Sequence, residues 1–147
     1  MKLEITIAKN TDDLNLCSSV RKQVFFDEEN GPESLYIIDD KDKDKNTLNI
    51  LGFINNIPVA TARFIKINYT TSKIQRMSVL SKYRNKGYAK ELLFFLEDCI
   101  KKCGYKIIEL DSSFKAVGFY EKYGYKRISD VFYEDNRPHI KLKKIIH

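Results

Sequence analysis

A strand, a basic turn and an amphipathic helix that follow one another directly constrain the fold more than any other feature. Residues 74–80 (IQRMSVL) form an apolar run typical of a strand, and residues 84–89 (RNKGYA) form a short basic turn that contains Gly87. From Gly87 to Gly104 apolar residues recur at helical spacing, and Gly104 is a typical helix C-cap. A second apolar run at residues 106–110 completes a β-α-β unit, whose two strands should pair in parallel.

The turn at residues 84–89 also predicts a site for an anion. It lies at a helix N-terminus, where unpaired backbone N–H groups and the helix dipole favour negative charge. Gly87 lets the backbone approach a ligand without a Cβ atom. An R-x-x-G-x-A string alone is weak evidence, but the strand before it and the helix after it indicate a phosphate-sized anion.

Ahead of this unit, the sequence predicts a strand, a helix and a long loop. Residues 3–7 alternate between apolar and polar side chains, as in a strand with one buried face. Residues 11–28 begin with a Thr-Asp-Asp cap and carry apolar residues at helical spacing. Residues 29–46 are polar, and the charged run at residues 39–45 predicts an exposed loop.

Two further hairpins are predicted. Asn55-Asn56 separates apolar runs at residues 48–54 and 57–67, and asparagine tolerates the positive φ that a two-residue turn requires. Residues 70–72 (TTS) then form the turn into the strand at residues 74–80.

The C-terminal part predicts a short helix and a last hairpin. Ser112 or Ser113 can cap a helix that Gly124 ends. Strands at residues 127–133 and 140–145 then form a hairpin around an Asn-Arg-Pro turn.

Composition bounds the class of protein. With 147 residues, the chain fits one domain, residues 1–147, and can bury a core without disulfides or a structural metal. The net charge is +6, but the lysines and arginines are spread along the chain and alternate with acidic residues. This distribution disfavours a nucleic-acid-binding protein. No apolar run approaches the roughly 20 residues that span a bilayer, so we expect a cytoplasmic protein with no membrane partner. Its three cysteines and two histidines lack metal-ligand spacing, and we expect no metal.

Three segments in this order resemble the Gcn5-related N-acetyltransferase (GNAT) family: residues 74–80, the turn at residues 84–89, and residues 119–125 (FYEKYGY). The likeness covers nearly the whole chain. Within the family, residues 25–29 (FFDEE) and Pro138-His139 resemble the small bacterial group of ElaA and YjcF type.

The resemblance implies an α/β fold with a mixed sheet. Most of that sheet is antiparallel, and it splays open at the central parallel β-α-β unit, with acetyl-coenzyme A (acetyl-CoA) bound in the gap. The pyrophosphate would lie on the basic turn, and the pantetheine arm would pair with the strand edge as an added strand does. The implied cofactor-binding residues are Met77, Ser78, Val79, Arg84, Asn85, Lys86, Gly87, Tyr88, Ala89, Phe119 and Tyr120.

Transfer of an acyl group to an amine requires a bound thioester, a neutral amine and a proton donor for the departing thiolate. The resemblance implies that the Val79 N–H polarises the thioester carbonyl and that the Tyr120 hydroxyl lies near the sulfur. Tyr120 could instead simply pack under the cofactor. Glu28 and Glu29 are candidate bases for the amine, although carboxylates beside a charged loop are usually only solvated.

Four more residues are candidates for the acceptor side. Asp40, from the charged loop, is a third carboxylate that could face the amine. Arg63 and Arg76 interrupt apolar strands, and they either bind an acidic group or pair inside the protein. His139 matches a recurrent position of the ElaA and YjcF group, but a lone histidine also serves structural roles.

The resemblance therefore implies an acetyl-CoA-dependent N-acetyltransferase. Its acceptor would be the primary amine of a small molecule or peptide, which attacks directly within a ternary complex. The same analogy allows a homodimer. A noncatalytic acyl-CoA-binding module or sensor is the alternative, because Ser112-Ser113 stands where related proteins often have Asn or Gln.

Overall fold

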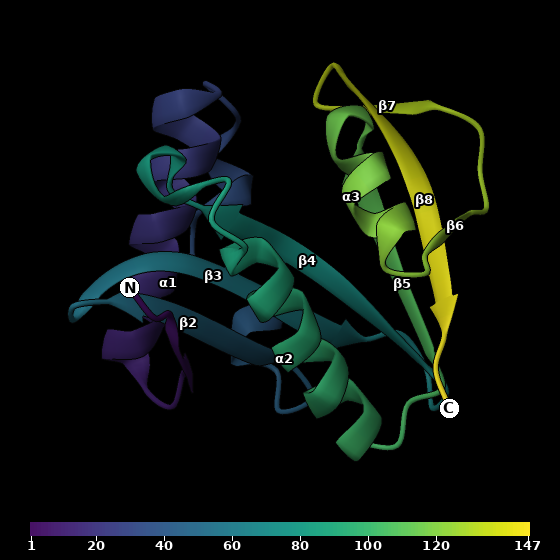
Figure 1. Cartoon of the computed structure of the whole chain (residues 1–147), viewed down its shortest axis with the longest axis horizontal. Helices are drawn as coiled ribbons and strands as arrows, with labels where there is room; N and C mark the ends of the chain where they lie inside the picture. Colours follow the sequence, from purple (N-terminus) through teal and green to yellow (C-terminus); the bar gives the residue numbers. More distant parts are fainter.

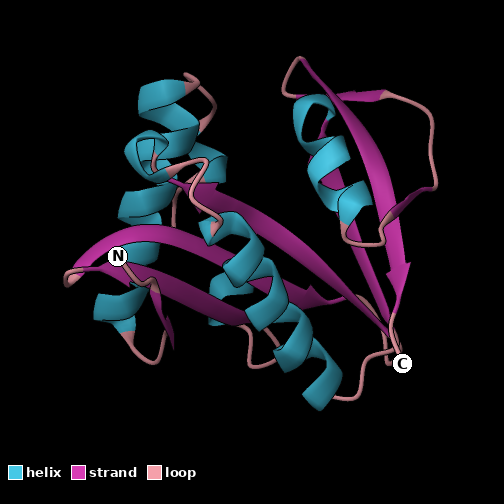
Figure 2. Ribbon diagram, in the orientation of Figure 1, coloured by secondary structure: helices cyan, strands magenta, loops and turns pink.

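The computed structural model describes residues 1–147 as a mixed sheet with helices on both faces (Figures 1 and 2). The strand order is β1-β2-β3-β4-β5-β8-β6, and β7 also pairs with β8. The strands are β1 (Glu4–Ile7), β2 (Leu48–Ile54), β3 (Ile57–Lys66), β4 (Thr71–Val79), β5 (Ile107–Ser113), β6 (Lys126–Arg127), β7 (Phe132–Glu134) and β8 (Arg137–Ile145). The α-helices are α1 (Thr11–Lys22), α2 (Tyr88–Lys102) and α3 (Val117–Lys122), and α1 continues as a π-helical segment, η1 (Gln23–Glu28). None of these helices combines the length and apolar character needed to cross a membrane.

The central strand β3 separates two different environments. Ala62 and Phe64 belong to the apolar core, which they share with Leu92 and Leu96 of α2. Arg63, between them, points to the opposite face, because successive side chains of a strand alternate. Figure 1 shows α2 in front of the sheet and α1 behind it. The face toward α1 therefore holds a polar cluster, while the face toward α2 holds the apolar core.

The strands β4 and β5 separate along their length. They pair in parallel only from Thr71 opposite Ile107 to Ile74 opposite Leu110. Beyond these pairs they diverge, and Figure 1 shows β5, β8 and α3 leaning away from β4 as a group. The predicted fold class is confirmed: the sheet is mixed and mostly antiparallel, with one parallel pair at a central splay.

Two predicted turns are confirmed. Ile54 pairs with Ile57, and Asn55 and Asn56 between them have φ of 48° and 65°, as a two-residue hairpin requires. Gly104, with φ of 92°, follows the end of α2.

Three predicted boundaries were wrong. The turn before β4 covers residues 67–70, because the Asn68 side chain accepts the N–H groups of Thr70 and Thr71 and so starts the strand earlier. Of the two serines expected to cap a helix, Ser112 lies within β5. Ser113 occupies the N-cap position of a short 3-10 turn, η5 (Phe114–Ala116), that leads into α3, but its side chain makes no capping hydrogen bond. The last hairpin turns at Asp135-Asn136, which have φ of 52° and 62°, so that β8 begins at Arg137.

The predicted exposed loop was also partly wrong. Of its charged run, Asp42 is 7% exposed, and it lies in a short 3-10 turn, η3 (Lys41–Lys43). The reason is tertiary: two arginines from distant segments, Arg21 and Arg63, bind this carboxylate.

Candidate functional site

A cleft with a volume of about 430 Å³ lies where β4 and β5 separate. Its walls come from these two strands, from α3, from the end of the first helical region and from the β7–β8 turn. The cleft is lined by ten of the predicted site residues: Glu29, Arg76, Met77, Ser78, Val79, Arg84, Ala89, Phe119, Tyr120 and His139. The other predicted site residues do not line the cleft.

The cleft edge of β4 is open near its end. The Leu80 N–H donates to the Val59 carbonyl oxygen of β3 at 2.9 Å. Since backbone groups alternate along a strand, the amide of Val79 points away from β3 and toward β5. β5 pairs with β4 only as far as Ile74, so the Val79 N–H has no strand partner on that side.

A helix N-terminus borders the same end of the cleft. Gly87 has φ of 84° and precedes α2, and no side chain caps the helix there. The N–H groups of the first turn of a helix lack partners within the helix, so those of Tyr88, Ala89 and Lys90 are available to a ligand. Asn85 and Lys86 complete the exposed turn, whereas the Tyr88 side chain is buried, with its hydroxyl donating to the Met1 carbonyl oxygen at 3.1 Å.

Arg84 connects this turn to the rest of the cleft. Its Nε donates to the Val79 carbonyl oxygen at 2.9 Å, and its Nη2 lies 2.7 Å from Glu28 Oε1. Glu28 does not line the cleft, and its ion pair restrains Arg84. It is the last residue of η1, and π-helical turns often occur at functional sites.

Tyr120 is a buried tyrosine that lines the cleft. It is 7% exposed, and Phe119 and Tyr125 pack edge-on against its ring with centroids 5.0 and 5.7 Å away. Its hydroxyl has no hydrogen-bond partner in the protein. Burial raises the pKa of Tyr120 to about 12, so the phenol stays protonated at neutral pH.

On the opposite wall, Arg137 holds two predicted residues together. Its Nη1 lies 2.6 Å from Glu29 Oε1, and its guanidinium also donates to the Glu29 carbonyl oxygen. The Arg137 carbonyl oxygen lies 2.9 Å from His139 Nδ1, and the His139 ring stacks on Phe132. A carbonyl oxygen can only accept, so Nδ1 carries the proton and Nε2 of the neutral ring carries the lone pair.

Arg63 and Asp40 do not line the cleft. Arg63 is 1% exposed and pairs inside the protein, with Nη1 2.7 Å from Asp39 Oδ1 and 2.9 Å from Asp42 Oδ1. Asp40 is exposed on the loop beside this cluster.

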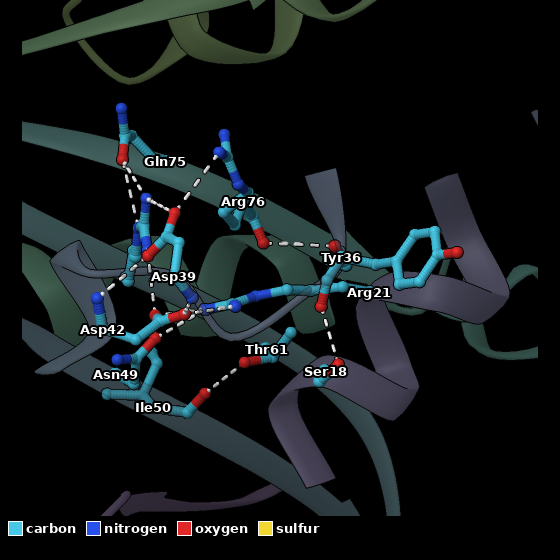
Figure 3. Close-up of polar contacts among 12 residues, drawn as sticks. Ser18, Arg21, Tyr36, Asp39, Asp42, Asn49, Ile50, Thr61, Gln75 and Arg76 are labelled. Atoms are coloured by element: carbon cyan, nitrogen blue, oxygen red, sulfur yellow. Dashed lines mark hydrogen bonds and ion pairs between the residues drawn. The ribbon is translucent and has the colours of Figure 1, made fainter. Parts of the chain in front are cut away.

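The buried cluster around Asp42 was missed from the sequence (Figure 3). Asp42 binds Arg21 through two hydrogen bonds of 2.9 and 3.0 Å, and Arg21 also donates to Asn49 at 2.7 Å. A signal was present, because Arg21 follows Cys17 and Val20 on the apolar side of a helix, where a charge needs a partner.

Next to this cluster, β4 contains a bulge. Thr61 pairs with Ser78 and Arg63 with Gln75, so Arg76 and Met77 stand opposite the single residue Ala62. Arg76 has φ of 58°, a left-handed conformation that is uncommon for residues other than glycine. The bulge redirects the strand at the point where its edge becomes part of the cleft.

Comparisons with known proteins agree with this geometry. A family model described as acetyltransferase (GNAT) domain matches residues 25–146. A Bacillus subtilis (strain 168) protein named as an acetyltransferase is 35% identical over 90% of this chain and 89% of its own length. The N-acetyltransferase YjcF of the same organism, itself uncharacterized, is 28% identical over 97% of this chain and 99% of its own.

Solved structures give the same result. Escherichia coli ElaA superposes with a TM-score of 0.86 at 26% identity, covering 97% of this chain and 99% of ElaA. A GNAT family acetyltransferase from Elizabethkingia anophelis, solved with acetyl-CoA bound, has a TM-score of 0.74 at 16% identity over 98% of each chain, which shows a shared fold. The fold and the cleft define an acyltransferase architecture, and the chain belongs to the GNAT acetyltransferase family.

Proposed function

We propose that this protein transfers an acetyl group from acetyl-CoA to a primary amine of a small molecule or peptide, by direct attack within a ternary complex. One observation carries the proposal: the open edge of β4 at Val79 lies beside a glycine-capped helix N-terminus with unpaired N–H groups. The strand N–H is a suitable donor for the thioester carbonyl oxygen, and the N–H groups of the helix N-terminus are suitable donors for a pyrophosphate. Family membership supports the same reaction class.

The turn at the start of α2 would bind the pyrophosphate. Backbone N–H groups and the helix dipole there favour negative charge, and Lys86 adds a cation. Gly87 leaves open space, since a Cβ atom there would meet no atom within 4 Å. The role proposed for Arg84 is indirect: tied to Glu28 and Val79, it holds the turn against the strand.

Val79 would stabilise the charge that develops during attack. Its N–H points into the gap, where it can donate to the thioester carbonyl oxygen as that oxygen becomes negative. The Arg84 contact to the carbonyl oxygen of Val79 restrains the position of this residue.

Tyr120 would donate to the departing sulfur. In the net reaction, the nitrogen–carbon bond forms, the carbon–sulfur bond breaks, and one amine proton ends on the sulfur. With its pKa raised to about 12, Tyr120 would offer a hydrogen bond to the thiolate at every physiological pH. Its lack of a protein partner leaves the hydroxyl free for this contact.

Glu29 and His139 are the candidates that could take the proton from the amine. Both line the cleft, whereas Glu28 is committed to Arg84 and Asp40 lies on the exposed loop. Glu29 is paired with Arg137, while His139 Nε2 keeps a free lone pair. We propose His139 as the base, with Glu29 positioning Arg137 and, through it, the ring.

Calorimetric titration with acetyl-CoA tests the proposal first, with adenosine and free acetate as controls. Saturable binding of acetyl-CoA, followed by amine-dependent release of free thiol across a panel of amines, is the expected result. Failure to bind acetyl-CoA would refute the proposal. Binding without turnover of any amine would favour the noncatalytic acyl-CoA-binding module.

A further inference from the structure

The polar cluster around Asp42, taken together with Arg76 at its edge, holds more positive than negative charge. It contains three guanidinium groups, from Arg21, Arg63 and Arg76, but only two carboxylates, from Asp39 and Asp42 (Figure 3). Charges taken out of water need partners, because desolvation penalises an unpaired ion by several kcal/mol. One of the three cations is therefore left without a full partner in the protein.

The distances identify Arg76 as that cation. Asp42 is bound by Arg21 and Arg63 at 2.9–3.0 Å, and Asp39 is bound by both Nη atoms of Arg63 at 2.7 and 3.1 Å. Arg76 Nη2 approaches Asp39 only to 3.9 Å, beyond hydrogen-bond distance. The Arg76 guanidinium donates no hydrogen bond to any protein group, although it has five N–H donors.

The other cations of the cleft are already paired. Arg84 lies 2.7 Å from Glu28, Arg137 lies 2.6 Å from Glu29, and Lys73 lies 2.7 Å from Asp111. Arg76 lines the same cleft, and its side chain is 21% exposed, so its donors are reached from the cleft. Burial and the neighbouring charges of Arg63 and Arg21 lower the pKa of the Arg76 guanidinium.

The position of Arg76 in the bulge also favours a ligand role. Its φ of 58° is a conformation that costs a residue with a long side chain more than it costs glycine or asparagine. Arg76 thus combines a strained backbone with a guanidinium that makes no internal hydrogen bond, and a ligand in the cleft would supply the missing partner. In Figure 3 its guanidinium lies at the edge of the cluster, with one dashed contact to Asp39.

We propose that Arg76 binds a carboxylate of the acceptor, so that the substrates are amines that also carry an acidic group, such as amino acids or peptides with a free carboxylate. This inference rests on the proposed function, and it names the substrate class. The planar guanidinium fits a carboxylate through two parallel hydrogen bonds. The acceptor would then supply the negative charge that the cluster lacks.

Matched acceptors test the proposal. Each pair consists of an ω-amino acid and its carboxamide, in a series of increasing chain length, together with a short peptide ending in a carboxylate or an amide. We expect kcat/KM to be about 10- to 100-fold higher for the acid than for the amide. A difference of this size is typical of a hydrogen bond between charged groups.

The variant Arg76→Asn should remove that preference. Asparagine tolerates a positive φ, so this change removes the cation and keeps the bulge. Arg76→Lys keeps the charge without the planar fork, and should restore part of the preference. Arg127→Asn is the matched control, because Arg127 is exposed and paired with Glu121 away from the cleft. A wild-type enzyme that does not discriminate acid from amide, or an Arg76→Asn variant that keeps the discrimination, would overturn the proposal.

A binding measurement separates this proposal from the proposed function. The ¹⁵N resonance of Arg76 Nε, assigned by its loss in Arg76→Asn, is followed during titration with each acid and each amide, with and without coenzyme A. A saturable shift with at least one acid and with no amide supports the carboxylate site, even if no turnover occurs. Absence of a shift with every acid refutes it, even if acetyl-CoA binds and other amines are acetylated.

Discussion

Arg21 and Asp42 form a bidentate ion pair, with Nη1 to Oδ2 at 3.0 Å and Nη2 to Oδ1 at 2.9 Å, and neither side chain is more than 1% exposed. The pair joins α1 to the loop before β2. Through Arg63, which binds Asp42 and also donates to Gln75 at 2.8 Å, the same cluster reaches β4 beside its bulge. The charged loop at residues 39–45 is thus fixed to β4, the strand that lines the cleft.

Removing one partner of this pair should destabilise the protein strongly. Asp42→Asn leaves the buried Arg21 without a carboxylate and leaves Arg63 with Asp39 alone. Breaking a buried pair in this way costs about 3–5 kcal/mol. Urea denaturation followed by circular dichroism measures the loss. The control is Asp98→Asn, because Asp98 and Lys102 form an exposed pair on α2, and its unfolding midpoint should stay at the wild-type value. Equal midpoints for both variants would contradict the structural role of Asp42.

Acid should weaken the fold through the same carboxylate. Burial alone would raise the pKa of Asp42, but hydrogen bonds and charge from Arg21, with Arg63, hold this pKa well below its ordinary value. A lowered folded pKa gives stability that is fully present above the unfolded pKa of about 3.9 and is lost as the pH falls through the folded pKa. Burial alone would also raise the pKa of Asp111, but hydrogen bonds and charge from Lys73 and Lys141 lower it. Asp111 therefore adds to the loss of stability in acid.

The denaturation midpoint should therefore be constant from neutral pH to about pH 5 and should fall below about pH 4. The midpoint of the Asp42→Asn variant should fall less steeply over that acid range, because the variant lacks the carboxylate of residue 42. A variant with the wild-type acid dependence would show that other carboxylates control it.

The buried cluster also shows where prediction from the sequence stops. The run at residues 39–45 alternates acidic and basic side chains, and such a pattern is typical of a solvated loop. Nothing within the run distinguishes Asp42 from Asp40, although one is buried and the other exposed. The difference depends on Arg21 and Arg63, which are brought together only by the tertiary fold.

Gly87 should matter for binding more than for folding. Gly87→Val places a β-branched residue at φ of 84°, a strain of about 1–2 kcal/mol, and it fills the space where the pyrophosphate would lie. We expect acetyl-CoA affinity to fall at least about 10-fold in calorimetry, since phosphate contacts of this kind are charge-assisted hydrogen bonds. Gly104→Val is a close match, because Gly104 lies at the other end of α2, has φ of 92°, and also has no atom within 4 Å of a Cβ position.

The two glycine variants should lose similar stability, but only Gly87→Val should lose affinity. Equal acetyl-CoA affinity in the two variants would show that the turn at residues 84–89 is not part of the acetyl-CoA site.

Tyr120→Phe should slow the reaction and leave the protein folded. The hydroxyl makes no hydrogen bond within the protein, so its removal leaves no buried group unpaired, and acetyl-CoA affinity should be unchanged. We expect kcat to fall about 10²-fold or more if the phenol acts on the sulfur. Because burial raises the pKa of Tyr120 to about 12, wild-type activity should not decline through Tyr120 ionisation at any pH below about 11. Full activity in the variant would show that Tyr120 only packs under the cofactor.

Local signals predicted the elements that border the cleft better than the bulge in β4. The Asn55-Asn56 hairpin, the glycine-capped helix and the apolar strands each carry their own turn or spacing signal. Val79 and Tyr120 line one cleft, and Gly87 precedes the helix at its end. The bulge at Arg76 has no such signal, because no glycine or asparagine marks it. Its position is set by the pairing of β4 with β3, which the sequence does not state.

His139 should be more important for turnover than Glu29. The Arg137 carbonyl oxygen holds the Nδ1 proton of His139, which leaves Nε2 to accept a proton from the amine. The Glu29 carboxylate instead forms an ion pair with Arg137, which makes it less available to accept a proton. His139→Gln should therefore lower kcat by about 10²-fold or more with little change in acetyl-CoA affinity, whereas Glu29→Gln should lower it by about 10-fold or less.

Single-turnover measurements with bound acetyl-CoA separate these effects from product release. The double variant is informative, because a base and the group that positions it act on the same step. If Glu29 works only through Arg137 and His139, then Glu29→Gln should add nothing in the His139→Gln background. A larger loss in Glu29→Gln than in His139→Gln would assign the base to the carboxylate and leave the ring a structural role.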